Sequence, residues 1–265
     1  NVLASVKKCL ENFSAKGLTI NEITSIGISN QRETFIVWDK NGQPLHNAVV
    51  WQCKRSVSIC EELKQQGLSD SVNQKTGLVI DPYFSATKLI WLFRHNQKVR
   101  EAVQNGKAFF GTIDTWLLYK LTSGKEYATD YTNASRTLFF NLHTLQWDNE
   151  LINEFGFADI NLPQIKSSAA VFGATDCNGL FSKKIPITAM IGDSHAAAFG
   201  EGCFEKGTAK ATLGTGCSIL MNIGEKPVQS KNGMVTTVCW SIDGRIDYAL
   251  EGVIVSCGAT IEWLK

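Results

Sequence analysis

Residues 185–200, IPITAMIGDSHAAAFG, decide the fold class. The first seven residues form a nearly continuous apolar run, which is typical of a buried β-strand. Gly192 and Asp193 end the run, and three alanines at 196–198 then favour a helix. A buried strand that leads directly into a helix is the repeating unit of α/β proteins, so this stretch predicts an α/β domain.

The remainder of the chain alternates in the same way. Residues 23–29 (ITSIGIS) predict a second buried strand, and residues 34–38 and 48–51 flank the turn dipeptide Asn41-Gly42, which predicts a hairpin. Helical spacing is found over residues 2–13, 56–66, 86–104 and 115–121. Beyond residue 207 the pattern favours strands, at 208–213, 217–222, 234–240 and 245–251. This change predicts a domain boundary, with one domain over 1–202 and a second beginning at 203–265.

Composition excludes several classes of protein. The 265 residues include 26 basic and 25 acidic side chains, a net charge of +1. A charge this balanced lacks the excess of basic residues that is typical of proteins that bind nucleic acid or an anionic membrane. No run of 18 apolar residues and no signal peptide is found, so we expect a cytoplasmic protein. The eight cysteines include no Cys-x-x-Cys pair and no zinc-binding spacing, so we expect no metal site.

Two polar clusters follow the predicted strands. Arg32 and Glu33 come after the strand at 23–29, and Asp193 comes after the strand at 185–191. Open α/β sheets bind ligands at the carboxyl ends of their strands. Arg32 and Glu33 can hydrogen-bond to neighbouring hydroxyls of a polyol. The alternative is a surface ion pair, which spacing alone favours.

Asp193 has two interpretations of equal weight on spacing alone. A carboxylate that faces a cleft can accept the proton of an attacking hydroxyl. Alternatively, Asp193 or Ser194 caps the helix that follows. The neighbouring His195 is more often structural than catalytic.

A third cluster is the turn Gly214-Thr215-Gly216, which exposes backbone N–H groups that can hold phosphate oxygens or simply closes a hairpin. Trp51 and Tyr83 can supply aromatic faces for the carbon chain of a polyol, or pack in the core. Neither a Walker A sequence nor a G-x-G-x-x-G fingerprint is present.

Six stretches resemble the FGGY family of carbohydrate kinases, and most closely its glycerol kinase branch. They are residues 28–56, 76–88, 110–125, 128–148, 185–204 and 210–225. The resemblance implies two actin-like (ribonuclease H-like) ATPase domains that close on a cleft, of which this chain holds mostly the first. It implies transfer of the γ-phosphoryl group of ATP, with Mg²⁺, to a hydroxyl of a small polyol or sugar.

The resemblance also assigns roles to the clusters. Asp193 becomes the general base. The polyol pocket becomes Arg32, Glu33, Trp51, Tyr83, Asp193, Ser194 and Ser218. Gly214, Thr215 and Gly216 become part of a turn near the ATP phosphates. We further expect a homo-oligomer in the full-length protein.

Some features depart from the family pattern. Glycerol kinases usually have Gln at the position of Ser194 and Phe at the position of Ser218, which favours a longer polyol or a ketose as an alternative substrate. The glycine and arginine of the bacterial regulatory loop are missing before residue 185, where Lys183 and Lys184 stand instead. The family's first phosphate loop would precede residue 1 and the adenosine pocket would follow residue 265, so we expect this chain alone to be inactive. A non-catalytic, ligand-binding actin-like module is the alternative of another class.

Overall fold

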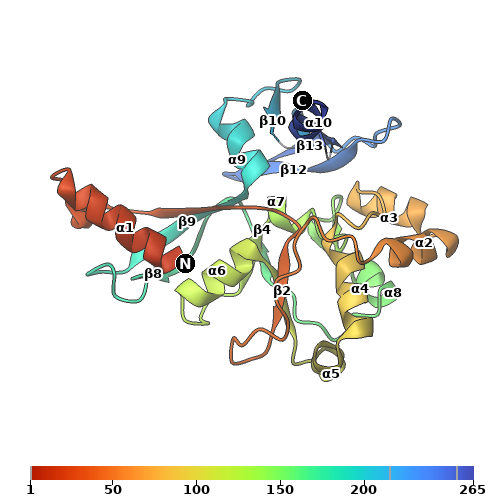
Figure 1. Ribbon diagram of the computed structural model, residues 1–265, viewed down its shortest axis with the longest axis horizontal. Helices are drawn as coiled ribbons and strands as arrows, with labels where there is room; N and C mark the ends of the chain where they lie inside the picture. Colours follow the sequence, from red (N-terminus) through yellow and green to blue (C-terminus); the bar gives the residue numbers. More distant parts are fainter. Residues whose placement is uncertain (1, 215, 255) are drawn as a thin grey trace.

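The computed structural model describes residues 2–214, 216–254 and 256–265 as a mixed α/β arrangement (Figure 1). The helices are α1 (Val2–Ala15), the short 3₁₀ helix η1 (Ile20–Glu22), α2 (Val57–Gln65), α3 (Ser69–Thr76), α4 (Ser85–His95), α5 (Gln97–Gln104), α6 (Ile113–Leu121), α7 (Tyr131–Ala134), α8 (Asn149–Glu154), α9 (Asp193–Gly200) and α10 (Gly258–Leu264). The strands are β1 (Ile26–Asn30), β2 (Phe35–Trp38), β3 (Phe109–Thr112), β4 (Ala128–Asp130), β5 (Phe140–Asn141), β6 (Gln146–Trp147), β7 (Gln164–Lys166), β8 (Ala169–Thr175), β9 (Ile185–Gly192), β10 (Ala209–Leu213), β11 (Cys217–Gly224), β12 (Val235–Ile242) and β13 (Arg245–Ile254). The predicted α/β class is confirmed.

The strand predicted from residues 185–191 is β9, the middle strand of a sheet with the order β1-β9-β8. It runs parallel to β1 and antiparallel to β8. In the parallel pair, Asn30 at the end of β1 lies opposite Gly192 at the end of β9. Both strands therefore end at one edge of the sheet, and the residues that follow them leave it side by side.

One face of this sheet is covered by α6 (Figure 1). Ile187 and Met190 of β9 are fully buried and pack with Ile28 of β1 and Leu118 of α6. Burying a side chain of this size stabilises the fold by about 1.5–3 kcal/mol. The apolar run that predicted the strand is therefore also what holds its register.

A second sheet, with the antiparallel order β10-β11-β13-β12, follows α9 and lies at the top of Figure 1. It packs on the first part of the chain, where Val238 and Tyr248 join a buried cluster with Phe140. The hydroxyls of Ser135 and Thr237 also hydrogen-bond across this contact, at 2.8 Å. The predicted division after residue 202 falls between α9 and β10, and a division into two domains stays a prediction.

The hairpin predicted across Asn41-Gly42 is only partly correct. The turn forms, with Gly42 at φ 71°, and residues 35–38 are β2. However, the ladder partner of β2 is β3, and the return arm makes single bridges from Pro44 to Trp38 and from Val49 to Phe35. Pro44 has no N–H to donate to a ladder, which explains why the return arm does not continue as a strand.

The single helix predicted over residues 86–104 is wrong. It is divided into α4 and α5 by Asn96, which has an extended backbone with φ −127° and ψ 109°. The Asn96 side chain accepts a hydrogen bond from the N–H of Val99 at 3.1 Å, so it caps the start of α5. In the described part of the chain, none of the helices has the length and apolar character needed to span a membrane.

Candidate functional site

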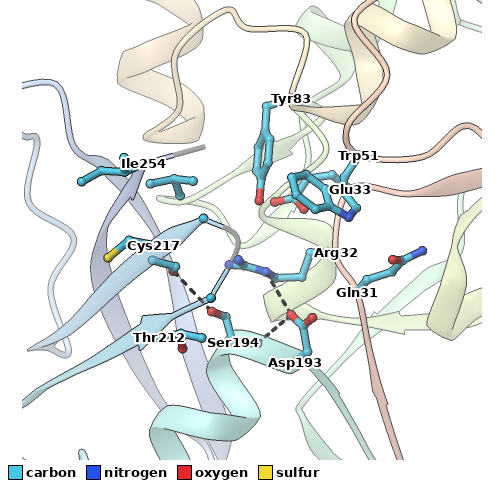
Figure 2. Close-up of a pocket in the computed structure, with 14 residues that line it drawn as sticks. Gln31, Arg32, Glu33, Trp51, Tyr83, Asp193, Ser194, Thr212, Cys217 and Ile254 are labelled. Carbon is cyan, nitrogen blue, oxygen red and sulfur yellow. Dashed lines mark hydrogen bonds and ion pairs between the residues drawn. The ribbon is translucent and has the colours of Figure 1, made fainter. Parts of the chain in front are cut away.

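The ends of β1 and β9 bring Arg32 and Asp193 together. The distance from Arg32 Nε to Asp193 Oδ1 is 3.7 Å (Figure 2). The Arg32 side chain is 5% exposed, whereas that of Asp193 is 58% exposed. A guanidinium buried at the edge of the sheet thus lies beside a carboxylate that solvent and ligands can reach.

A cavity of about 330 Å³ opens beside this pair, and nearly every residue predicted for the site lines it. The predicted residues around it are Arg32, Glu33, Trp51, Tyr83, Asp193, Ser194, Gly214, Gly216 and Ser218. Thr215, which was predicted with them, lies outside the described residues. The structure therefore gathers residues from five separate stretches of the chain around one pocket of the size that small ligands occupy.

The short helix α7 holds the two strand ends in place. The N–H of Gly192 donates to Thr132 Oγ1 at 2.8 Å, and that hydroxyl donates to the Asp130 carboxylate. On the other strand, the Asn30 side-chain amide donates to Asn133 Oδ1 at 2.8 Å. Because Thr132 and Asn133 are neighbours in α7, one helical turn fixes the backbone just before both Arg32 and Asp193.

Asp193 does not fill the N-cap position. The residue at that position is Gly192, and Asp193 is the first residue of α9. Its Oδ1 atom accepts a hydrogen bond from the N–H of Ser194 at 2.7 Å (Figure 2). Because the carboxylate has a second oxygen and lines the cavity, an interaction with the helix end leaves it able to act on a ligand.

A buried ion network lies behind the cavity. Arg32 donates through both terminal nitrogens to the carboxylate of Glu251, at 2.8 and 3.0 Å. Arg136 pairs with Glu33 at 2.6 Å and with Glu251 at 2.7 Å. All four side chains are at most 5% exposed, and two positive charges balance two negative ones. The network holds Arg32 and Glu33 in fixed positions at the cavity wall.

Electrostatics keep Glu251 ionised. Burial alone would raise its pKa, but Arg136 and Arg32 lower the pKa of this carboxyl well below its usual range. Sequence reasoning missed both Arg136 and Glu251. A charge inside the apolar strand sequence YALEGVI (residues 248–254) is costly unless it is paired, and that cost is the signal that could have identified Glu251.

Trp51 and Tyr83 form one wall of the cavity (Figure 2). Their rings meet edge to face, with centroids 5.6 Å apart and planes at 71°. Burial, followed by the nearby Glu33, raises the pKa of Tyr83 to about 12, so its hydroxyl is neutral at physiological pH. The wall is therefore an apolar surface with one neutral hydroxyl.

Ser194 and Ser218 lie on the opposite side, from α9 and β11. Their hydroxyl oxygens are 3.5 Å apart. Lys210, on β10, lies behind them and is 3% exposed. Lys210 was also missed by sequence reasoning, since its contact with Ser194 depends on the packing of α9 against β10.

His195 does not line this cavity. It is fully buried, and burial followed by the charge of Arg32 holds its pKa well below the usual value. A neutral, buried imidazole agrees with the structural interpretation of this residue.

Comparisons with known proteins agree with the geometry. The model of the FGGY family of carbohydrate kinases, N-terminal domain, matches residues 1–200. A glycerol kinase from Carboxydothermus hydrogenoformans is 54% identical over 245 residues, which are 92% of this chain and 49% of that protein. A glycerol kinase from a Geobacillus species is 48% identical over 266 residues, covering 100% of this chain and 53% of its own length. The chain thus spans about half the length of the curated relatives it matches.

Solved structures give the same result. The crystal structure of Plasmodium falciparum glycerol kinase with ADP superposes with a TM-score of 0.93 at 38% identity, covering all of this chain and 53% of that one. Gluconate kinase from Lactobacillus acidophilus superposes with a TM-score of 0.84 at 21% identity, over 99% of this chain and 52% of its own, which shows a shared fold. The actin-like ATPase fold expected from the resemblance is confirmed.

Proposed function

The chain belongs to the FGGY family of carbohydrate kinases, and we propose on this basis that the protein transfers the γ-phosphoryl group of ATP to a hydroxyl of a small polyol such as glycerol. The observation that carries the proposal is the Asp193 carboxylate, which is exposed at the cavity beside a fixed guanidinium. The relatives named glycerol kinase support a polyol as the acceptor.

In this mechanism Asp193 accepts the proton of the attacking hydroxyl. A positioned carboxylate of this kind contributes about 100- to 10,000-fold to the rate. Its position at the first residue of α9, directly after the sheet edge, holds it on a rigid element rather than a loop. Phosphoryl transfer depends mainly on positioning and charge, so this rigidity is a direct contribution to catalysis.

Arg32 and Glu33 hold neighbouring hydroxyls of the polyol. The guanidinium has five N–H donors, and its bonds to Glu251 leave others for oxygen atoms in the cavity. Glu33 is oriented by Arg136 and accepts hydroxyl protons. Trp51 and Tyr83 pack against the C–H face of the carbon chain.

Gly214 and Gly216 form the side of the cavity where the phosphates of ATP would enter. A Cβ atom on Gly214 would make an ordinary van der Waals contact with the carbonyl oxygen of Gly216, at 3.8 Å. Because glycines have no side chains, these two positions leave the backbone bare at the cavity, which suits a phosphate group of ATP.

We propose that Mg²⁺ enters as part of the nucleotide substrate. Among residues 2–214, 216–254 and 256–265, no group of three or more His, Cys, Asp and Glu side chains is placed to hold a metal ion. Mg²⁺ usually keeps several of its waters and binds through one or two carboxylates together with substrate phosphates, so it would reach this cavity with ATP. A cytoplasmic location and a homo-oligomeric state of the full-length protein stay predictions.

The test is a panel of polyols and sugars, assayed for ADP release with the full-length protein that contains this chain and MgATP. We expect phosphorylation of glycerol or a longer polyol at a rate well above that of the Asp193→Asn variant. Binding of polyols with no turnover above the level of that variant would favour the non-catalytic module instead.

A further inference from the structure

Ser194 and Ser218 place two hydroxyl groups at the cavity. Each hydroxyl is hydrogen-bonded to a buried charged side chain, Lys210 or Glu251. Lys210 Nζ donates to Ser194 Oγ at 2.8 Å and to Thr212 Oγ1 at 2.7 Å. Ser218 Oγ donates to Glu251 Oε1 at 3.1 Å. The two serines come from α9 and β11, so their meeting depends on the packing of this helix against the second sheet.

These partners fix what each serine can still offer. Ser194 accepts from Lys210, so its own O–H proton is left to be donated. Ser218 gives its proton to Glu251, an ionised carboxylate that can only accept, so the lone pairs of Ser218 are left to accept. The separation of 3.5 Å between the two oxygens is long for an O–H···O bond, which is best at about 2.7–2.8 Å. The serines therefore satisfy each other poorly.

One donor and one acceptor, side by side and facing a cavity, are the complement of a single hydroxyl group. We propose that Ser194 and Ser218 form a subsite for one further substrate hydroxyl, carried on the fourth carbon of a polyol with at least four carbons. A carbonyl oxygen would use the donor of Ser194 and leave Ser218 without a partner, so the pair selects an alcohol over a ketone or aldehyde. This inference rests on the proposed kinase function.

The subsite lies next to the groups proposed to hold the first hydroxyls. Glu251 Oε1 accepts from Arg32 at 2.8 Å and from Ser218 at 3.1 Å, so the guanidinium and the Ser218 hydroxyl share one carboxylate oxygen. Ser194 directly follows Asp193 and donates its N–H to that carboxylate. A chain that places hydroxyls at Arg32 and Asp193 therefore reaches the serine pair by extension through one more carbon.

The experiment compares erythritol with its 4-deoxy analogue, the butane-1,2,3-triol of the same configuration, in the full-length protein with MgATP. The two molecules have the same carbon chain and differ in one hydroxyl. Two well-made hydrogen bonds at a half-buried site predict a kcat/KM about 10- to 100-fold higher for erythritol. Calorimetric binding of both compounds without ATP provides a readout that is independent of turnover, and the same preference is expected there.

Three variants locate the effect. Ser194→Ala and Ser218→Ala should each reduce the ratio of erythritol to deoxy analogue to within a few-fold of one. Ser58→Ala, on the exposed side of α2 and outside the cavity lining, is the matched control and should keep the ratio of the unmodified protein.

The outcomes separate this inference from the proposed function. Phosphorylation of glycerol and of both four-carbon compounds at equal efficiency would overturn the subsite and leave the kinase function standing. A preference for erythritol that survives both serine substitutions would overturn the assignment to these residues. Failure to phosphorylate any polyol would overturn the kinase function and this inference with it.

Discussion

The side chain of Arg32 lies directly against Gly192. Its Cγ and Cδ atoms are 2.7 Å from the position that a Cβ atom on residue 192 would occupy, closer than real Cβ contacts allow. Gly192 is also the last residue of β9 and the residue before Asp193. The glycine therefore sets how closely the guanidinium can approach the carboxylate.

We predict that Gly192→Ala weakens substrate binding. The added methyl group displaces Arg32, which cannot move without distorting its paired bonds to Glu251. A misplacement of about 1 Å in a catalytic site can cost about 100-fold in rate. Steady-state kinetics of the full-length variant should show a raised KM for the polyol and a lower kcat.

Gly200→Ala is the matched control, at the other end of the same helix. An added Cβ there would have no described heavy atom within 4 Å, and alanine is favoured over glycine in helices by about 1 kcal/mol. This variant should keep the kinetics of the unmodified protein and be slightly more stable. Equal kinetics for both alanine variants would contradict the role of Gly192.

Asp193→Asn should lower kcat by about 100- to 10,000-fold, because the amide keeps the shape of the carboxylate but cannot take up the proton. The KM for the polyol should change much less. Since the side chain is 58% exposed, the free energy of unfolding should change by less than about 1 kcal/mol. If the Asp193→Asn variant turned over within a few-fold of the unmodified protein, Asp193 would not be the general base and would only stabilise the end of the helix.

Glu251→Gln should destabilise the protein by about 3–5 kcal/mol, the usual cost of breaking a buried ion pair. The substitution leaves Arg32 and Arg136 in the interior with Glu33 as their remaining carboxylate in the network. Chemical denaturation followed by fluorescence measures the change. The matched control is Glu150→Gln, which removes the 86%-exposed partner of Lys75 and should cost less than about 1 kcal/mol.

The buried Asp114 predicts a pH dependence of stability. Burial, followed by the nearby Asp130, raises the pKa of Asp114 from 3.8 to about 6. Between about pH 4 and pH 6 the folded protein holds this proton and the unfolded chain has lost it, so the contribution of Asp114 to stability decreases as the pH rises. About two pKa units correspond to about 3 kcal/mol.

Asp114→Asn removes this titration, so its free energy of unfolding should decline less steeply than that of the unmodified protein from pH 4 to pH 6. Above about pH 7, where Asp114 is ionised in both states, the two slopes should agree. Parallel slopes over the lower range would mean that this carboxyl does not titrate as its burial implies.

The residues of the site that directly follow a strand were predictable from the sequence. Arg32 and Asp193 follow apolar strands, and the parallel pairing of β1 with β9 brings these two ends together. Arg136 and Glu251 were not predictable in this way, because their ion-pair partners lie far away in the sequence. Lys210 was missed because its contact with Ser194 depends on how α9 packs against β10. Their signal is the cost of burying a charge, which is evident only once the surrounding strand is known to be buried.

The errors in the fold have local causes. Asn96 continues the helical spacing of its neighbours, and its capping hydrogen bond outweighs that pattern. Pro44 lies in a stretch with a clear turn signal, but it cannot donate to a ladder. In both cases one side chain decides the backbone conformation against the hydrophobic pattern around it.

The ion network also dictates an order of events during synthesis. Arg32 and its partner Glu251 are 219 residues apart, and Arg136 is made between them. At a translation rate of about 5–20 residues per second, roughly 10 to 40 seconds pass before the counter-charge of Arg32 leaves the ribosome. Before Glu251 is made, the nascent chain contains Arg32 and Arg136 without the carboxylate that both of them contact in the folded protein. The positions of Arg32 and Glu33 at the cavity wall can therefore be fixed only after Glu251 has been made, when all three strands of the first sheet have already been synthesised.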